Sequence, residues 1–495
     1  MSAVRKTAEQ VKEELEAAIR AKIVVMKFGG TSVEDAKAIL RTAEIVRGRR
    51  EKGLLPVVVV SAMAKVTDQL LAAASAAGRG DKAGALALAA RLRNRHIDTA
   101  ADLLRGDLFT QIEAFIRRRF DSLDDLLRGI ASVGELTPRT SDKVVSFGER
   151  SSSQIVAATL AQQGQNGAHV DARRCIVTDN HYGKAAPLPP AIEVRLNELV
   201  LPLVQAGQTP VIGGFIGATA EGIRTTLGRG GSDFTAALVG AGMNAGAIEI
   251  WTDVNGIMTT DPRICPDALR VKTISFEEAA ELAYFGAKVL HPATILPAVQ
   301  KSIPVWVLNS HNAENEGTKI TAMAPHCTSP FKSIAAKKKL TIIDIVAGRM
   351  LMTHGYLKSV FDVFNEFECA IDMVSTSEVS ISLSVESNDR LPAICAELSK
   401  IADVKFEGNK ALICMVGEDI RGQSGIAGRV FSAVRHVNVR MISQGASEIN
   451  MSFMIEESDV DEAVRSLHAA FFVDPDPTVF DTTARAAAAK VSVAR

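Results

Sequence analysis

Residues 23–63 read IVVMKFGGTSVEDAKAILRTAEIVRGRREKGLLPVVVVSAM, and this stretch decides the fold class. An apolar run rich in β-branched residues, IVVMKF, is followed by the helical pattern DAKAILRTAEIV and then by a second apolar run, LLPVVVVSAM. Strand, helix and strand in this order are typical of a βαβ unit on a parallel sheet that is buried on both faces. The stretch therefore predicts an α/β domain.

The same alternation continues along the chain. Further strands are expected at AHVDA, TPVIGGFIG, AIEIWTDV and IPVWVL, with helix-like segments such as DFTAALVGAGMN between them. Residues 68–130 are rich in Ala, Leu, Arg and Asp at helical spacing, which predicts a helical excursion from the sheet. We expect one large α/β domain over 22–325, preceded by a charged helical extension at 1–21.

An internal repeat follows this domain. The stretch FDVFNEFECAIDMVSTSEVSISLSVE, from Phe361, resembles GRVFSAVRHVNVRMISQGASEINMSFMIEE, from Gly428. Each copy reads as helix, turn, strand, loop and strand. The repeat predicts two α+β modules at 335–410 and 411–478, which could be nested, before a frayed tail at 479–495. The string GQSGIAG resembles a dinucleotide fingerprint but follows no βαβ strand, so we interpret it as a helix-start turn.

Composition narrows the classes of partner. The 495 residues include 56 Lys and Arg against 57 Asp and Glu, so no bulk charge favours nucleic acid or acidic lipid. Six dispersed cysteines without a CxxC pair indicate reduced thiols and argue against a structural zinc site. The N-terminus mixes charges throughout and no run of about 18 apolar residues occurs. We expect a cytoplasmic protein with no membrane or nucleic-acid partner.

Two glycine-rich turns predict anion binding. KFGGTS begins at Lys27, at the end of an apolar run and before a helix, where glycine N–H groups and the lysine charge can meet a phosphate. GRGGSD begins at Gly228 and opens a second helix, and its glycines clear the space around the guanidinium of Arg229. The alternatives are an ordinary strand-to-helix turn and a helix-capping role for Asp233.

Two further motifs carry polar groups. SFGERS begins at Ser146, and WTDVNGIMTTDPR spans 251–263 at the end of an expected strand. The hydroxyls, acids and arginine of the second motif suit a nucleotide's ribose and phosphates, although the segment taken alone is only a loop.

The sequence resembles the aspartate kinase family. KFGGTS, SFGE, GRGGSD, WTDVNGIMTTDPR and FGAKVLHPAT occur in the family's order, and the likeness covers 22 to about 475. It implies the three-layer amino-acid kinase fold with a mainly parallel central sheet, followed by two ferredoxin-like ACT modules. MVSTSEVS is most similar to the lysine-inhibited, monofunctional branch.

The implied activity is phosphoryl transfer from ATP with Mg²⁺ to the side-chain carboxylate of L-aspartate, which gives 4-phospho-L-aspartate and ADP on the way to lysine, threonine and methionine. An aspartate side chain with a pKa of about 3.9 is ionised at pH 7 and needs no general base. The obstacle is repulsion, because like unit charges 4 Å apart cost about 4 kcal/mol at an effective dielectric of 20. Cations must therefore converge on the reactants.

The resemblance also implies site residues. Lys27 would neutralise the transferring phosphoryl group and Arg229 would bind the α-carboxylate of aspartate. Glu149 and Asp233 would bind its α-ammonium. The remaining substrate-binding positions are Ser61, Thr67, Phe215 and Ser232. The nucleotide-binding positions are Lys27, Gly29, Gly30, Thr31, Ser32, Thr252, Asp253, Met258, Arg263, Lys288 and Val289. No dedicated metal ligands are implied.

Some of these positions have plain alternatives or depart from the family. Lys288 could be a surface lysine. Met258 stands where the lysine-sensitive branch usually has a tyrosine, so a soft apolar contact replaces an aromatic stack. Lys65 stands where glycine is common, and it could stiffen its loop or add a phosphate contact.

The repeat also suggests an effector. Superposing the copies puts Asp372 opposite Arg440, so only the first copy offers carboxylates, Asp372 and Glu378, to a cationic amino acid such as lysine. The implied lysine site comprises Met350, Tyr356, Leu357, Asp372, Ser377 and Glu378. The alternative is that both acids are solvated loop residues. ACT pairs usually assemble across subunits, so we expect a homodimer or a dimer of dimers.

Two rival functions remain open from the residues. Another amino-acid kinase, acting on glutamate, acetylglutamate or a nucleotide, would not be expected to combine GRGGSD, TTDPR and two ACT-like modules. A catalytically silent amino-acid sensor would not need Lys27, Glu149, Arg229 and Asp233.

Overall fold

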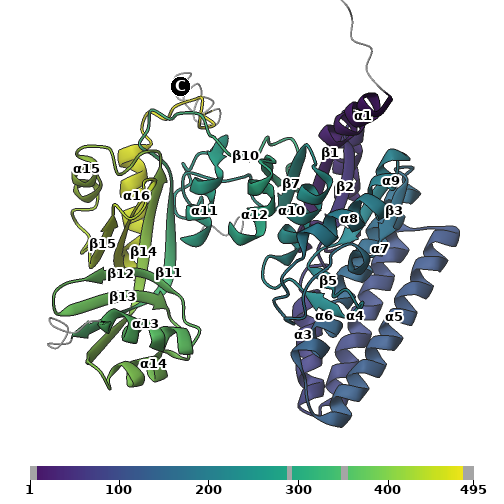
Figure 1. Cartoon of the computed structure of the whole chain (residues 1–495), viewed down its shortest axis with the longest axis horizontal. Coiled ribbons are helices and arrows are strands. Elements are labelled where there is room, and N and C mark those ends of the chain that lie inside the picture. Colours follow the sequence, from purple (N-terminus) through teal and green to yellow (C-terminus); the bar gives the residue numbers. More distant parts are fainter. Residues whose placement is uncertain (1–7, 287–291, 347–354, 483–495) are drawn as a thin grey trace, which may run out of the picture. The chain divides into compact units, whose positions relative to one another are not determined.

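The computed structural model describes residues 8–286, 292–346 and 355–482 (Figure 1). Within these ranges the chain forms two compact units. The first contains the residues up to 256 and those at 292–324, and the second contains 257–286 and the residues from 325 onward. No helix among the described residues combines the length and the apolar character that crossing a bilayer requires.

The first unit contains a central sheet with the strand order β3-β4-β2-β1-β7-β9-β10. Neighbouring strands are parallel from β3 to β9, and β10 is antiparallel to β9. The mainly parallel sheet predicted from the sequence is confirmed. The strands are β1 (Ile23–Phe28), β2 (Leu55–Val60), β3 (Gly167–Val170), β4 (Thr209–Gly213), β7 (Ala247–Thr252), β9 (Val305–Asn309) and β10 (Thr318–Thr321).

Helices cover both faces of this sheet, which makes the three layers. Alternate residues of β1 point to opposite faces: Val24 and Met26 belong to a core cluster with helix α2, whereas Val25 lies on the side of Gly240 in helix α10. The first face carries α2 (Ala36–Glu51) and α7 (Phe147–Gln162), and the second carries α8 (Pro189–Leu199), α10 (Gly231–Met243) and α12 (Pro292–Gln300).

The predicted helical excursion is also confirmed. Three helices that contact one another extend from the first face of the sheet, and the two longest run side by side in Figure 1. They are α3 (Val66–Gly78), α4 (Lys82–Leu103) and α5 (Gly106–Val133). The remaining elements of this unit are α1 (Ala8–Lys22), η1 (Gly30–Val33), α6 (Pro138–Val145), η2 (Ala172–Arg174), α9 (Leu201–Gln205), β5 (Ile216–Ala218) and β6 (Arg224–Thr226).

The second unit contains an antiparallel sheet with the order β12-β13-β11-β14-β16-β15. Its central strands, β11 (Phe331–Val346) and β14 (Asp403–Gly417), pass through both repeats: one half of β11 pairs with β13, and the opposite half of β14 pairs with β16. The two α+β modules predicted from the repeat therefore share one continuous sheet. The other strands are β12 (Ile371–Thr376), β13 (Ser380–Glu386), β15 (Met441–Gln444) and β16 (Asn450–Glu456).

The helices of this unit follow the repeat. Each module has one helix before its hairpin and one beyond it, and an additional short strand and helix precede the modules. They are α13 (Tyr356–Glu366) and α14 (Leu391–Leu398), α15 (Ile426–Ala433) and α16 (Val460–Phe471), and β8 (Thr273–Ser275) with α11 (Phe276–Tyr284). Gly425, in the string GQSGIAG, is the N-cap of α15 with φ +77°, so this string is the helix-start turn predicted from the sequence.

A buried ion pair joins α11 to β11. Lys332 Nζ lies 2.8 Å from Glu278 Oε1, and the two side chains are only 2% and 4% exposed. Glu278 also accepts a hydrogen bond from the backbone N–H of Ser275, which completes the N-terminal cap of α11. Removing one member of such a pair leaves an uncompensated buried charge.

We therefore expect Lys332→Ala to lower the free energy of unfolding by about 3–5 kcal/mol. The matched control is Lys338→Ala, because Lys338 pairs with Asp461 and both side chains are more than 40% exposed. That variant should lose less than about 1 kcal/mol. Urea denaturation followed by circular dichroism measures both changes, and equal losses in the two variants would contradict this account.

Candidate active site

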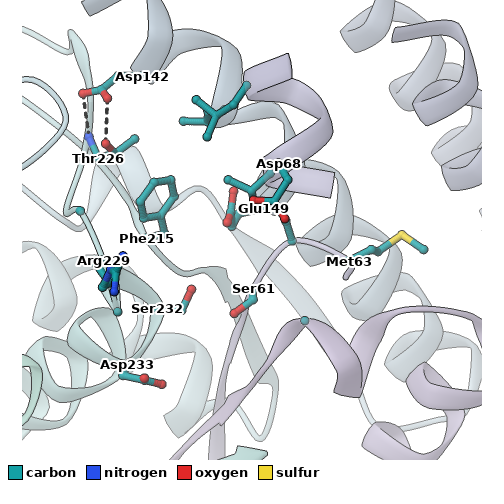
Figure 2. A pocket seen from close by; sticks show the side chains of 18 of the residues that line it. Ser61, Met63, Asp68, Asp142, Glu149, Phe215, Thr226, Arg229, Ser232 and Asp233 are labelled. Carbon is teal, nitrogen blue, oxygen red and sulfur yellow. Dashed lines mark hydrogen bonds between the residues drawn. The ribbon is translucent and has the colours of Figure 1, made fainter. Parts of the chain in front are cut away.

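A pocket of about 560 Å³ lies in the first unit, at the carboxyl ends of β1, β2 and β4. In open α/β sheets this edge is where ligands usually bind. Figure 2 shows side chains from several separate elements around this space. Lys27 lines it together with all the substrate-binding residues implied by the resemblance: Ser61, Thr67, Glu149, Phe215, Arg229, Ser232 and Asp233.

Lys27 and Asp233 form an ion pair within this pocket. Lys27 is the penultimate residue of the buried strand β1, and Asp233 is in the first turn of α10. Lys27 Nζ lies 2.7 Å from Asp233 Oδ1, and the side chains are 11% and 16% exposed. The sequence assigned these residues to different reactants and did not predict the pair. Because Asp233 holds the ammonium, it orients the only charged side chain of β1 toward the pocket.

Glu149 is a buried carboxyl group without a cationic partner among the described residues. It lies in the first turn of α7, is 3% exposed, and its Oε2 atom makes no hydrogen bond within the described chain. Burial raises the pKa of Glu149 to about 7, although backbone N–H groups of Glu149 and Ala62 partly oppose this shift. An ammonium group entering the pocket would supply the missing charge.

The turn that carries Arg229 is shaped by close backbone contacts. A Cβ atom on Gly231 would come within 2.7 Å of the Phe215 ring, so only glycine lets α10 begin this close to Phe215. Phe215 itself has φ +66°, a strained conformation for a non-glycine residue that often marks a functional site. Its N–H donates to Thr235 Oγ1 at 2.9 Å and its carbonyl accepts from Leu227 at 2.9 Å. Arg229 is exposed at the rim.

Sequence reasoning missed Asp142, a buried residue of α6. Its carboxylate accepts hydrogen bonds from the N–H and hydroxyl of Thr226, at 3.0 and 2.7 Å, and from the N–H of Gly183 (Figure 2). Burial raises the pKa of Asp142, and these hydrogen bonds partly oppose the shift. Thr226 ends β6, two residues before the Arg229 turn, so Asp142 fixes the base of that turn. No motif around Asp142 signals this role.

The KFGGTS motif, predicted to bind the nucleotide, lies beside the end of β7. The N–H of Gly29 donates to the Trp251 carbonyl at 3.2 Å, and Gly30 lines the pocket. The hydroxyl of Ser32 was expected to contact phosphate, but it is buried and donates to Ser310 Oγ at 2.8 Å. Ser310, which the sequence did not single out, also donates to the Thr252 carbonyl at 3.1 Å. Ser32 therefore joins two turns rather than facing the pocket.

The other predicted nucleotide-binding residues that the structure describes are divided between the two units. Asp253 is exposed in the turn after β7. Met258 and Arg263 belong to the second unit, where Arg263 makes a bidentate pair with Asp261. The Met258 carbonyl accepts a hydrogen bond from Ser333 Oγ of β11 at 2.7 Å. Lys288 and Val289 lie outside the described residues.

Lys65 has φ +66° and is the N-cap of α3. This left-handed conformation explains why glycine suits the position, since a side chain there is strained. Lys65 is exposed and lines the pocket beside Asp68, a further acid that the sequence did not predict.

Some predicted effector residues of the first module are exposed, but Asp372 is not. The Asp372 side chain is 3% exposed and pairs with Lys337 Nζ at 2.8 Å, so it is not the open carboxylate expected from the sequence. Glu386 shares the same ammonium at 2.9 Å, which leaves two acids for one base. Burial raises the pKa of Asp372, and the contacts with Lys337 oppose the shift.

The remaining described effector residues lie elsewhere in the first module. Ser377 and Glu378 are exposed in the turn between β12 and β13, where Ser377 Oγ lies 2.7 Å from Ser380 Oγ. Tyr356 and Leu357 begin α13. Met350 lies outside the described residues.

Comparison with known proteins identifies the family. The model of the amino acid kinase family matches residues 22–309, and an ACT domain model matches residues 413–471. Aspartokinase 2, chloroplastic, of Arabidopsis thaliana is 37% identical over 92% of this chain and 85% of its own length. Lysine-sensitive aspartokinase 3 of Escherichia coli is 34% identical over 91% and 99%. The chain therefore belongs to the amino acid kinase family and, within it, to the aspartokinases.

Solved structures agree with this assignment. The structure of E. coli aspartokinase III in complex with aspartate and ADP, in its R-state, has a TM-score of 0.79 and 34% identity over 91% of this chain and all of that one. The same protein in complex with lysine and aspartate, in its T-state, gives a TM-score of 0.78 over the same shares.

The buried carboxyl group of Glu149 should reduce stability at neutral pH. The folded protein retains a proton on Glu149 that the unfolded chain releases above pH 4.5, so stability falls as the pH rises from there to about 7. We expect Glu149→Gln to unfold with a free energy higher by up to roughly 3 kcal/mol at pH 8, and with no gain near pH 4.5.

Urea denaturation at both pH values measures this difference. Glu135→Gln, which changes an exposed acid before α6, is the control and should change neither value. Equal or lower stability of Glu149→Gln at pH 8 would contradict the proposed burial penalty.

Proposed function

We propose that this chain transfers the γ-phosphoryl group of ATP to the side-chain carboxylate of L-aspartate. The bond from the γ-phosphorus to the β-phosphate oxygen breaks, a bond to a carboxylate oxygen forms, and 4-phospho-L-aspartate and ADP are released. The observation that carries this proposal is a single pocket that combines Lys27 and Arg229 with the buried, unpaired carboxyl of Glu149. An amino acid with a second carboxylate presents the complementary charges.

The pocket residues have distinct proposed roles. Lys27, held by Asp233, neutralises charge on the transferring phosphoryl group, which is the main task of a protein in phosphoryl transfer. Arg229 binds the α-carboxylate with its guanidinium fork. Glu149 binds the α-ammonium, and the two charges offset the burial penalty that each would carry alone. The side-chain carboxylate then faces Lys27, already ionised and without need of a base.

We propose that Mg²⁺ enters with the phosphates of ATP. This ion usually keeps several waters and binds proteins through one or two carboxylates together with substrate phosphates. The carboxylates of Asp68 and Asp233 line the pocket and fit such a donor set. Bound in this way, the ion would neutralise charge that develops on the phosphate oxygens.

The activity is tested by trapping the acyl phosphate with hydroxylamine, since 4-phospho-L-aspartate gives a coloured hydroxamate. We expect ATP-dependent hydroxamate from L-aspartate, and a loss of at least about 1,000-fold in kcat for Lys27→Met. Lys37→Met, an exposed lysine of α2, is the matched control and should retain full activity.

Three outcomes would count against the proposal. Product from glutamate or acetylglutamate in place of aspartate would indicate a different amino-acid kinase. No product from any acceptor would indicate a silent sensor. Full activity of Lys27→Met would remove the proposed role of that residue.

We also propose that lysine inhibits the enzyme by binding to the first module, in a homodimer formed through the ACT modules. Asp372 and Glu386 leave surplus negative charge around Lys337 at the open end of the β12–β13 hairpin, and Glu378 offers an exposed carboxylate in the turn at its other end. Within the second unit, β11 contacts part of the motif predicted to bind the nucleotide. Ser333 and Ile334 of β11 donate hydrogen bonds to the carbonyls of Met258 and Thr259. A shift of the regulatory sheet would therefore move a segment of the nucleotide motif. Such couplings are usually worth about 1–3 kcal/mol.

Glu378→Gln tests the effector site without disturbing a buried pair. A hydrogen bond to a charged group contributes about 1.5–3 kcal/mol, so the lysine concentration for half-inhibition should rise by at least about tenfold while kcat stays unchanged. Asp362→Asn, an exposed acid on α13, is the control and should respond to lysine normally. An unchanged lysine response of Glu378→Gln, or inhibition by threonine instead of lysine, would contradict the proposal.

A further inference from the structure

Four arginines surround one aspartate in the first unit, and none of the five residues lines the substrate pocket. We call this group the arginine cluster: Arg119 of α5, Arg150 of α7, Arg173 of η2 and Arg224 of β6, together with Asp171. The charges of Arg173, Arg119 and Arg224 repel that of Arg150, so the four cations lie close enough to interact electrostatically. One carboxylate cannot neutralise four guanidinium groups, and the cluster carries a surplus of positive charge.

The carboxylate of Asp171 is largely used by one of these arginines. Arg173 donates from Nε to Oδ1 at 2.9 Å and from Nη2 to Oδ2 at 2.5 Å, a bidentate pair. Arg150 Nη2 reaches Oδ2 only at 3.7 Å, beyond hydrogen-bonding distance. Burial alone would raise the pKa of Asp171, but the contacts with Arg173 and Arg150 lower it to about 2. This carboxylate therefore stays ionised and offers little to the other arginines.

Two guanidinium nitrogens of the cluster are buried without a hydrogen-bond partner in the described chain: Arg150 Nη1 and Arg224 Nη1. The side chain of Arg150 is 5% exposed, whereas that of Arg173 is 26% exposed. Arg150 is thus a deeply buried member of the cluster, whereas Arg173 is accessible to solvent. A buried charged donor without a partner is costly, and proteins usually satisfy such groups.

Among the described residues, Asp171 is the acid whose charge acts on Arg119, Arg150 and Arg224. His169 of β3 contacts Gln154 and Ser153 through its two ring nitrogens, and burial together with the arginines lowers its pKa to about 4, so it is neutral at pH 7. Arg224 lies over the ring of Phe147, with its guanidinium carbon 5.6 Å from the ring centroid. Burial, the largest cause, and the neighbouring arginines lower the pKa of Arg150 to about 9, so it remains charged at pH 7.

We propose that the arginine cluster binds a small multivalent oxyanion of the phosphate class, at a site separate from the substrate pocket. Guanidinium groups match the oxygens of phosphate with paired N–H donors, and two of those donors are free here. Two of its arginines lie close in the chain to predicted substrate-binding residues: Arg150 follows Glu149 on α7, and Arg224 begins β6, the strand before Arg229. An anion held by the cluster would fix these two elements together and would affect aspartate binding.

The first experiment is isothermal titration of the full-length protein with inorganic phosphate, at constant ionic strength in chloride. The substrate pocket is kept occupied by aspartate and a non-hydrolysable ATP analogue, so that binding there does not contribute. We expect saturable binding that weakens at least tenfold in Arg150→Gln and in Arg119→Gln. Arg118→Gln, an exposed neighbour on α5 with the same charge change, is the control and should bind normally. Arg119 is only half-buried, so its variant preserves the test if Arg150→Gln fails to fold.

A parallel titration with glycerol phosphate distinguishes the source of the anion: binding of both compounds indicates any phosphate group, and binding of inorganic phosphate alone indicates the free ion. Phosphate should also lower the KM for aspartate in the native enzyme but not in Arg119→Gln. Lys27→Met should retain phosphate binding although it is inactive, which separates this proposal from the catalytic one. No saturable binding, or equal binding by all variants, would overturn the proposal.

Discussion

The central constraint on this aspartokinase is electrostatic, because its reaction must bring two anions into contact. A carboxylate and a polyphosphate repel one another, and only converging cations and N–H donors remove that repulsion. The parallel sheet solves the geometric part of the problem, because the carboxyl ends of β1, β2 and β4 deliver their turns to one edge. Lys27, near the end of β1 and paired with Asp233, is fixed by a strand that is buried along its whole length. The cation therefore needs little reorganisation during the reaction.

The same site accumulates features that reduce stability. Glu149 is a buried carboxyl with an unpaired oxygen, and Phe215 and Lys65 both have left-handed backbone conformations. Each would be unfavourable in an ordinary core. They are concentrated around one pocket, while the surrounding core consists of buried aliphatic and aromatic side chains. The surrounding sheet and helices hold these residues in place, and a bound ammonium group, as proposed for the substrate, would relieve the penalty at Glu149.

The fold and the pocket could be predicted from the sequence because their signals are local. The apolar runs IVVMKF and LLPVVVV and the GRGGSD turn each lie within a few consecutive residues, and each copy of the repeat after residue 361 is one continuous stretch. The contacts that were missed join distant segments: Asp142 holds Thr226, Ser32 bonds to Ser310, and Lys337 neutralises Asp372. The roles of such residues depend on tertiary neighbours that neither periodicity nor a motif encodes. The arginine cluster escaped prediction for the same reason, since its members come from four elements.

The central claim is that Lys27 and Arg229 bring both reactants into one pocket. A crystal structure of the full-length protein with L-aspartate and a non-hydrolysable ATP analogue tests it most directly. The account predicts the terminal phosphate and the side-chain carboxylate of aspartate on either side of Lys27 Nζ, with the α-carboxylate on Arg229 and the α-ammonium on Glu149. Aspartate and nucleotide in separate crevices, without contact to Lys27, would contradict it.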